Sequence, residues 1–194
     1  MTRLRLALLV AAALLATTGL PPSAGEASTG QRHFSPFNGA GELKVSYNVR
    51  RRSGDCNSES FVDGRRDAWR CFVGNNILDP CFESPVEADV VACVESPWTR
   101  SVVRVSSVLD TRSRFQDQRG GPAWALVLRG GKRCVFASGA TSAFHGRRLN
   151  YFCGRHGPYL FGAPDKSHAT WRIRAAKTPQ PQSVYWRRIR TAWR

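Results

Sequence analysis

The chain has 194 residues, a formal net charge of +15 and 42% hydrophobic residues. This length and composition fit one folded domain and exclude a collagen-like repeat or an acidic disordered protein. Beyond the first few dozen residues, no apolar run reaches the roughly 18 residues needed to cross a bilayer, so no membrane-spanning helix is expected in the body of the chain.

The first 26 residues are predicted to be a secretory signal peptide. Arg3 and Arg5 precede an apolar run from Leu6 to Ala16, and small residues around Ala24 offer a cleavage site. An uncleaved anchor is the alternative, but the apolar run is short for a membrane span. The first cysteine, Cys56, lies too far from the cleavage site for a lipid anchor. We therefore expect a secreted, extracytoplasmic protein.

Six cysteines follow this segment. An even number in an oxidising compartment indicates disulfides. Zinc sites need ligand pairs two to four residues apart, whereas Cys71 and Cys81, the closest pair, are ten residues apart. No metal and no cofactor are therefore expected. The spacing favours three local disulfides: Cys56–Cys71, Cys81–Cys93 and Cys134–Cys153.

The mature chain is predicted to begin with a flexible lead-in, residues 27–41, which is rich in Gly, Ser and Pro. Residues 42–194 are predicted to form a single disulfide-stapled, β-rich domain. Residues 42–50 alternate between apolar and polar side chains, as a half-buried strand requires. Residues 65–74 contain no breaker before Gly74, so one short helix is expected there.

After Pro97 the pattern indicates only strands. Gly130 and Gly131 can adopt the positive φ that a tight hairpin turn needs. Short strands with turn residues between them predict a mainly β fold, an antiparallel sandwich or barrel. The strands are expected at 102–108, 124–129, 132–136, 148–153, 159–161, 170–175 and 184–193.

The positive charge is concentrated in the second half of the chain. Residues 28–117 contain twelve basic and twelve acidic residues, whereas residues 118–194 contain fifteen basic residues and one acid, Asp165. A GC-rich genome explains why Arg outnumbers Lys, but it does not explain the near absence of acids after Asp117. The second half is therefore the candidate binding region.

In the predicted strand 170–175, Arg172 and Arg174 lie on the side opposite the apolar residues. In the last predicted strand, Trp186, Arg188 and Arg190 share one side, and Tyr185, Arg187 and Ile189 share the other. If these strands are neighbours, their arginines form one basic face. Such a face attracts anionic polymers, membrane headgroups or nucleic acid, and the alternative is a solvated face that keeps the protein soluble. The predicted anion-binding residues are Arg172, Arg174, Arg188 and Arg190.

The C-terminal residues also permit a different structure. As a helix, Trp186, Ile189 and Trp193 would form an apolar stripe beside arginines, which is typical of an interfacial cationic segment. The strand is favoured because Val, Tyr, Trp and Thr prefer strands.

Few residues are arranged for catalysis. The chain contains no Gly-x-Ser-x-Gly or His-Glu-x-x-His motif. A metal-independent ribonuclease needs two imidazoles and a cation beside the phosphate. His145, His156 and His168, with Arg147 or Arg172, offer these groups. Because the first two histidines precede glycines in expected loops, surface positions are favoured and no catalytic residue is assigned.

Several motifs centre on the cysteines: Cys56, the run Arg66-Asp67-Ala68-Trp69-Arg70-Cys71, Asp79-Pro80-Cys81-Phe82, Trp124-Ala125-Leu126, Cys134, Tyr151 with Cys153, and Ala192-Trp193. Together they resemble uncharacterised exported proteins of actinomycetes and extracellular segments of some receptor-type serine/threonine kinases. The resemblance covers about residues 50–194. It implies an exported, envelope-associated or ligand-sensing domain and brings no activity with it. The chain departs from the kinase-linked form because neither a transmembrane helix nor a kinase domain is expected.

We therefore expect a secreted, non-enzymatic binding or structural domain whose basic second half contacts an anionic component of the cell envelope. The expected partner is an anionic polymer or membrane surface, with nucleic acid less favoured and no protein partner indicated. One alternative is a small secreted hydrolase, in particular a metal-independent ribonuclease. Another is a membrane-active or inhibitory factor that acts through Val184 to Arg194.

Overall fold

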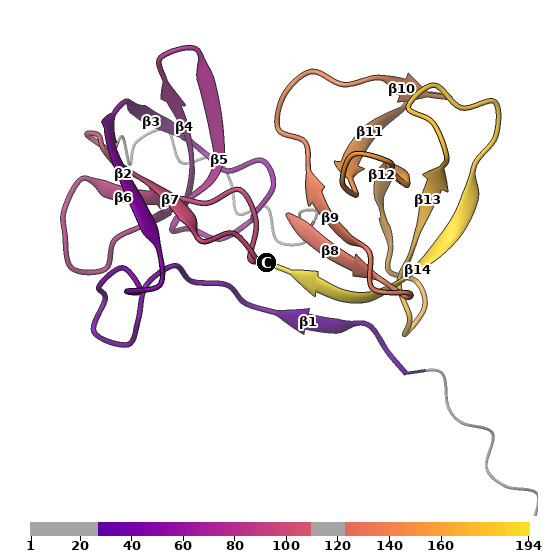
Figure 1. Cartoon of the computed structure of the whole chain (residues 1–194), viewed down its shortest axis with the longest axis horizontal. Helices are drawn as coiled ribbons and strands as arrows, with labels where there is room; N and C mark the ends of the chain where they lie inside the picture. Colours follow the sequence, from indigo (N-terminus) through magenta and orange to yellow (C-terminus); the bar gives the residue numbers. More distant parts are fainter. Residues whose placement is uncertain (1–26, 110–122) are drawn as a thin grey trace, which may run out of the picture.

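The computed structural model describes residues 27–109 and 123–194; the expected signal peptide, residues 1–26, lies outside this range. The regular elements of the described residues are all β-strands, and they form two lobes that lie side by side (Figure 1). None of the described residues forms a helix long and apolar enough to cross a membrane. The predicted mainly β fold is confirmed.

Seven strands precede the undescribed segment 110–122 and seven follow it. The first seven are β1 (Gly30–Arg32), β2 (Asn48–Ser53), β3 (Asp55–Glu59), β4 (Ala68–Val73), β5 (Asn76–Glu83), β6 (Val90–Cys93) and β7 (Ser101–Ser106). The others are β8 (Ala125–Leu128), β9 (Arg133–Phe136), β10 (Ala143–Phe144), β11 (Arg147–Phe152), β12 (Tyr159–Asp165), β13 (Arg172–Ala176) and β14 (Tyr185–Trp193).

The first lobe is a six-stranded sheet in the order β2-β7-β6-β5-β4-β3. Its two outermost strands, β2 and β3, are consecutive in the chain and are separated only by Gly54. A Cβ at Gly54 would lie 2.5 Å from the carbonyl oxygen of Phe72, so only glycine allows this close approach. The sheet therefore curls until its first and last strands meet.

The second lobe is a closed antiparallel barrel. Its strands follow one another as a meander, β8, β9, β11, β12, β13 and β14, and β14 then pairs with β8. The expected hairpin at Gly130 and Gly131 joins β8 to β9, and both glycines have positive φ. Leu126, Leu160, Ile173 and other apolar side chains fill the interior. The sequence predicted an antiparallel sandwich or barrel, and the second lobe is a barrel.

Three disulfides join neighbouring strands, and the predicted pairing is confirmed. Cys56–Cys71 links β3 to β4, Cys81–Cys93 links β5 to β6, and Cys134–Cys153 links β9 to the end of β11. Three intramolecular disulfides are consistent with an oxidising environment outside the cytoplasm.

The helix expected over residues 65–74 is wrong, because this segment contains strand β4. Trp69 and Cys71 are buried while Phe72 is exposed, which is the alternation of a strand. β4 pairs with β3 on one side and β5 on the other, and Gly74 turns the chain into β5. Hydrogen bonds to the strands on either side of this segment outweigh the marginal stability of a short helix.

The strand expected over residues 42–50 is also wrong for most of its length, because β2 begins only at Asn48. Before it, Asn38 Oδ1 accepts hydrogen bonds from the backbone N–H groups of Ala40 and Glu42, which closes a turn. Val45 is 102% exposed, so the apolar side chains of this segment do not share one buried face.

Residues 27–41, expected to be a flexible lead-in, contact both lobes. β1 pairs in parallel with the end of β14 (Figure 1). Phe34 and Phe37 are buried in a cluster that includes residues of both sheets. The Phe34 ring lies 5.3 Å from Trp124 of the second lobe and 5.6 Å from Phe82 of the first. This segment therefore fills the junction between the lobes.

The C-terminal segment is strand β14, so the alternative of a C-terminal helix is wrong. Trp186 is exposed and Ile189 is buried, which places them on opposite sides of the strand. Trp193 packs against Trp98 of the first lobe with ring centroids 5.1 Å apart. An apolar helical stripe therefore does not exist here.

Candidate functional site

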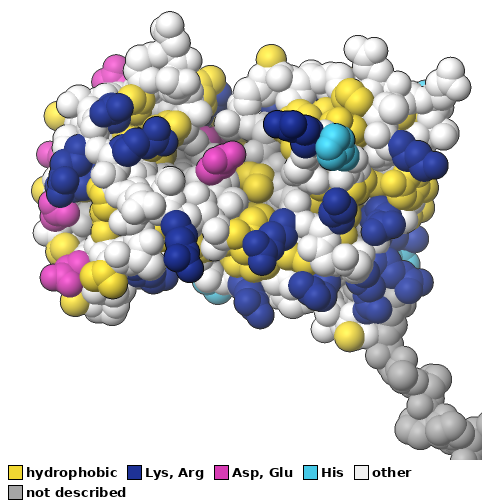
Figure 2. Space-filling model, in the orientation of Figure 1, with side chains coloured by type: hydrophobic (Ala, Val, Ile, Leu, Met, Phe, Trp, Pro, Cys, Tyr) yellow, Lys and Arg dark blue, Asp and Glu magenta, His cyan; other side chains and the backbone are white. Residues whose placement is uncertain are grey.

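The two lobes differ in net charge, as the uneven distribution of basic residues in the sequence predicts. Residues 27–109 contain ten basic and ten acidic residues, whereas residues 123–194 contain fourteen basic residues and one acid. On the face shown in Figure 2, Lys and Arg side chains gather over the part of the second lobe that contains β13 and β14. The second lobe therefore carries most of the net positive charge of the described residues.

The four arginines predicted to bind anions lie on neighbouring strands. β13 pairs with β14 so that Arg172 is opposite Arg188 and Arg174 is opposite Trp186. Arg188 and Arg190 are exposed, and Arg172 and Arg174 are partly exposed. We call these four residues, Arg172, Arg174, Arg188 and Arg190, the arginine face. That the face binds anions stays a prediction.

Trp186 holds part of the arginine face in position. The guanidinium carbon atoms of Arg172 and Arg174 lie 4.7 Å and 5.1 Å from the centre of its indole. This is the geometry of a cation–π contact, which orders an arginine while leaving its N–H groups available. Trp186 is 46% exposed, so a ligand on this face would touch the indole as well.

Asp165 is the one acid of residues 123–194, and it contacts the arginine face. Its carboxylate accepts hydrogen bonds from the Ser167 hydroxyl at 2.6 Å, from Arg172 Nε at 2.8 Å and from the Ser167 backbone at 3.0 Å. These bonds, the Ser167 hydroxyl first and then Arg172, hold the pKa of Asp165 well below its ordinary value. Asp165 therefore neutralises part of the charge of Arg172.

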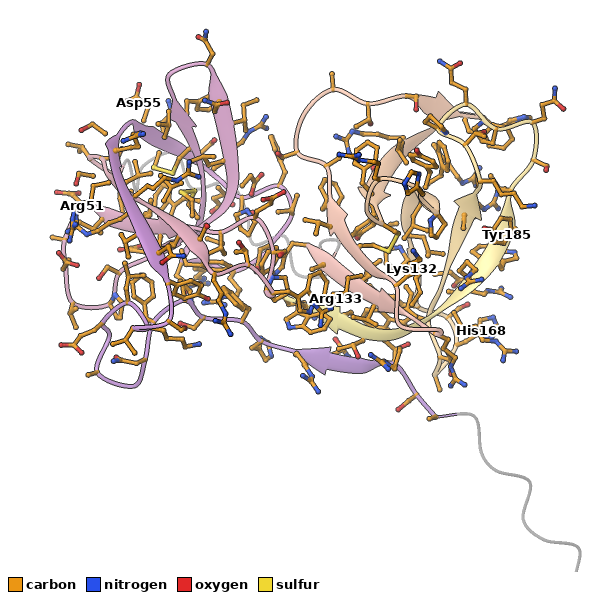
Figure 3. The ribbon with its side chains drawn as sticks, in the orientation of Figure 1. Arg51, Asp55, Lys132, Arg133, His168 and Tyr185 are labelled. Atoms are coloured by element: carbon orange, nitrogen blue, oxygen red, sulfur yellow. A yellow bond between two sulfur atoms is a disulfide. The ribbon has the colours of Figure 1, made fainter. Side chains whose placement is uncertain are left out.

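A pocket of about 370 Å³ adjoins the arginine face. It is lined by Arg172 and Arg188 together with His168, Ala169 and Thr170 of the β12–β13 connection. Figure 3 shows His168 near the lower edge of the second lobe. The pocket gives the arginine face a recess beside its exposed surface.

A second basic pocket, of about 450 Å³, lies at one end of the barrel. No sequence pattern predicts this pocket, because its residues come from four separate parts of the chain. The strand order does explain the pocket. In an antiparallel meander, every second connection lies at the same end of the barrel. It is lined by Lys132, His156, Gly157, Pro158, Lys177, Tyr185 and Arg187.

The three histidines considered for catalysis lie at separate places. His145 has a positive φ in the turn between β10 and β11 and contacts the Phe144 ring at 4.2 Å. His156 lines the pocket at the barrel end, and His168 lines the pocket beside the arginine face. No two of these three imidazoles therefore line the same pocket among those described above.

A cleft of about 480 Å³ lies between the two lobes. Its walls include Ile77 and Leu78 from β5 and Val135 and Phe136 from β9. Asp79 also contributes, and burial raises the pKa of its carboxyl to about 6, although hydrogen bonds from the Ser60 hydroxyl and the Phe61 backbone act in the opposite direction.

One group of cysteines has sulfur atoms close enough to hold a metal ion. The Sγ atoms of Cys71, Cys81 and Cys93 lie within 4.8 Å of one another. Each of these sulfur atoms belongs to a disulfide, so none offers the thiolate that a metal requires. The cluster results from two disulfides on adjacent strands.

Comparison with known proteins finds no matching family model, no matching curated protein and no matching solved structure. The function is therefore inferred from the geometry and charge of the sites above.

Proposed function

We propose that this protein is a secreted, non-enzymatic binding domain that contacts an anionic polymer of the cell envelope through the arginine face. The observation that carries the proposal is the pairing of β13 with β14, which sets Arg172 opposite Arg188 and Arg174 opposite Trp186. The exposed Arg190 follows two residues after Arg188 on β14. Expulsion of counterions from the polymer would supply most of the binding free energy.

The spacing of the arginines favours a polymer over a single small ion. Side chains on one side of a strand repeat every two residues, or about 7 Å. Arg188 and Arg190 are spaced in this way on β14, as are Arg172 and Arg174 on β13. A row of cations with a regular repeat suits a chain whose negative charges also repeat. Trp186, between the arginines, supplies a flat apolar surface for the backbone of such a chain.

The same geometry weighs against the two alternatives. A ribonuclease would need two imidazoles at one phosphate, and His145, His156 and His168 lie apart. A membrane-active C-terminal segment would have to leave the barrel, but β14 pairs with β13, β8 and β1. Releasing it would break the barrel and expose its core.

The test is a salt series with the oxidised protein on immobilised heparin and on wall preparations that contain teichoic acid. The variant R174Q/R190Q removes two charges from the arginine face without touching the Asp165–Arg172 pair. The matched control R51Q/R52Q removes two exposed charges from β2 of the first lobe. We expect the slope of log K against log salt to fall by about one for each arginine contact removed, and to stay unchanged in the control.

The proposal is wrong if neither matrix retains the wild-type protein at low salt, or if the control variant loses as much affinity as R174Q/R190Q. Retention by anionic vesicles alone, without polymer binding, would replace the polymer with a membrane. RNA cleavage that is abolished by H145A, H156A or H168A would replace the proposal with the ribonuclease.

A further inference from the structure

Three connections between strands meet at the end of the barrel where β8 joins β9. In an antiparallel meander, successive connections alternate between the two ends of the barrel. The β8–β9, β11–β12 and β13–β14 connections therefore meet at the same end. We call the pocket at this end the cationic mouth and define it by Lys132, His156, Lys177, Tyr185 and Arg187.

The charges at the cationic mouth have one sign. Lys132, Lys177 and Arg187 line one pocket, and no acidic residue is among the lining residues. Among the described residues, the ion pairs Arg65–Asp67, Arg104–Glu87 and Arg172–Asp165 involve none of these three cations. Three cations held around one pocket repel one another, and an anion between them removes that repulsion.

Part of the mouth is held in place before any ligand arrives. The Cys134–Cys153 disulfide ties β9 to the end of β11, so the segments that carry Lys132 and His156 are covalently linked. Arg187 Nη2 donates a hydrogen bond to the backbone oxygen of Arg129 at 3.2 Å, which fixes the guanidinium beside the β8–β9 turn. Such pre-organisation lowers the entropic cost of binding.

The cationic mouth is separate from the arginine face, although both include β14. Arg187 lies opposite the buried Ile173, and Arg188 lies opposite Arg172. Because neighbouring side chains of a strand point to opposite sides, Arg187 lies toward the barrel interior and Arg188 lies on its outer surface. Figure 3 shows Lys132 by the β8–β9 turn and Tyr185 at the start of β14.

We propose that the cationic mouth binds a phosphate-type oxyanion. Two lysine ammonium groups and a guanidinium match a compact anion with a high charge, and the Tyr185 hydroxyl and His156 imidazole add hydrogen-bonding groups. The volume of about 450 Å³ exceeds that of a bare phosphate, so the site has room for an organic group attached to the phosphate. The phosphate is either a free ion or ester, or the terminal group of a polymer on the arginine face.

The test is a titration of the oxidised, full-length protein with inorganic phosphate at low salt, followed by calorimetry and by amide NMR shifts. The variant K132Q/K177Q removes two cations of the mouth, and R51Q/R52Q is again the control of equal charge. We expect phosphate to shift the amides of Gly157 and Lys132. We expect its affinity to fall at least fivefold in K132Q/K177Q and less than twofold in the control and in R174Q/R190Q.

Polyphosphate distinguishes the two sources of the phosphate. If its affinity falls in both K132Q/K177Q and R174Q/R190Q, the mouth takes the end of a polymer that also occupies the arginine face. If the affinity for polyphosphate falls only in R174Q/R190Q, while the affinity for inorganic phosphate falls in K132Q/K177Q, the cationic mouth binds a free anion. The inference is overturned if phosphate binds no better than chloride, or if K132Q/K177Q binds phosphate like the wild type. Neither result bears on whether R174Q/R190Q weakens polymer retention.

Discussion

Arg172 and Arg188 lie directly opposite each other in the antiparallel ladder between β13 and β14. Like charges directly opposite each other destabilise a sheet. Asp165 offsets part of the charge of Arg172 through its hydrogen bond to Nε. The β13–β14 ladder therefore places two like charges opposite each other, with Asp165 beside one of them.

The first prediction follows from that repulsion. Replacing Arg188 with Thr removes one of the opposed charges and introduces a residue that favours strands, so the free energy of unfolding should rise by about 0.5 kcal/mol at low salt. Affinity for heparin should fall at the same time. Thermal unfolding at low and high salt measures the first effect, which should shrink as salt screens the repulsion. R190T is the control, because the β13–β14 register assigns Arg190 no partner on β13. A lower stability of R188T at low salt would contradict the prediction.

The second prediction concerns pH. Burial raises the pKa of Asp63 to about 6, against the opposing charge of Arg65, and Asp63 Oδ2 has no hydrogen-bond partner among the described residues. A carboxyl whose pKa is raised on folding stabilises the protonated native state. The contribution of Asp63 to stability should therefore be greatest below about pH 4 and should be lost as pH rises through 6, by roughly 3 kcal/mol. Asp79, with a pKa also raised to about 6, acts in the same direction.

The variant D63N tests this directly, since the amide cannot ionise. It should be more stable than the wild type at pH 7.5 and should show a flatter profile in denaturant unfolding between pH 4 and 7.5. D55N removes an exposed carboxylate of β3 and should leave the profile unchanged. A wild-type profile in D63N would show that Asp63 does not cause the pH dependence.

The third prediction separates the disulfides by function. Removing Cys134–Cys153 with C134A/C153A should cost about 3 kcal/mol in the chain-entropy model and should also weaken phosphate binding, because it frees the two segments of the cationic mouth. C56A/C71A should cost a similar amount and leave phosphate binding intact, because that disulfide lies in the first lobe. Chemical unfolding and phosphate titration at low temperature measure both effects. Equal loss of phosphate affinity in the two variants would argue against a local role.

The fourth prediction tests the junction between the lobes. F34A removes a buried ring that contacts both Phe82 and Trp124, so unfolding should become easier by about 3 kcal/mol. V45A, only eleven residues later, truncates a side chain that is 102% exposed and should change stability by less than about 0.5 kcal/mol. Similar stabilities for the two variants would mean that residues 27–41 do not contribute to the core.

Local patterns predicted the parts of the fold that local forces decide. The alternation of Arg172, Ile173 and Arg174 identified a strand and its outward face, and a second strand close in sequence supplied the rest of the arginine face. Short loops are easily closed, which is why the three sequence-local disulfides were predictable.

Periodicity within one segment failed where strand pairing or a side-chain hydrogen bond decides the structure. Residues 65–74 have no breaker, yet β3 and β5 pair with this segment and make it a strand. Residues 42–47 alternate like a strand, yet the turn at Asn38 leaves them without a ladder.

The sequence by itself determined the β class of the fold, the disulfide pairs and the concentration of basic residues in the second half. Each of these depends on composition or on residues close together in the chain. Only the tertiary structure decided that β14 closes a barrel on β8 and that Lys132, Lys177 and Arg187 surround one pocket. Those residues are brought together by hydrogen bonding between strands far apart in the chain, and a pattern of period two carries no information about which distant strand becomes a neighbour.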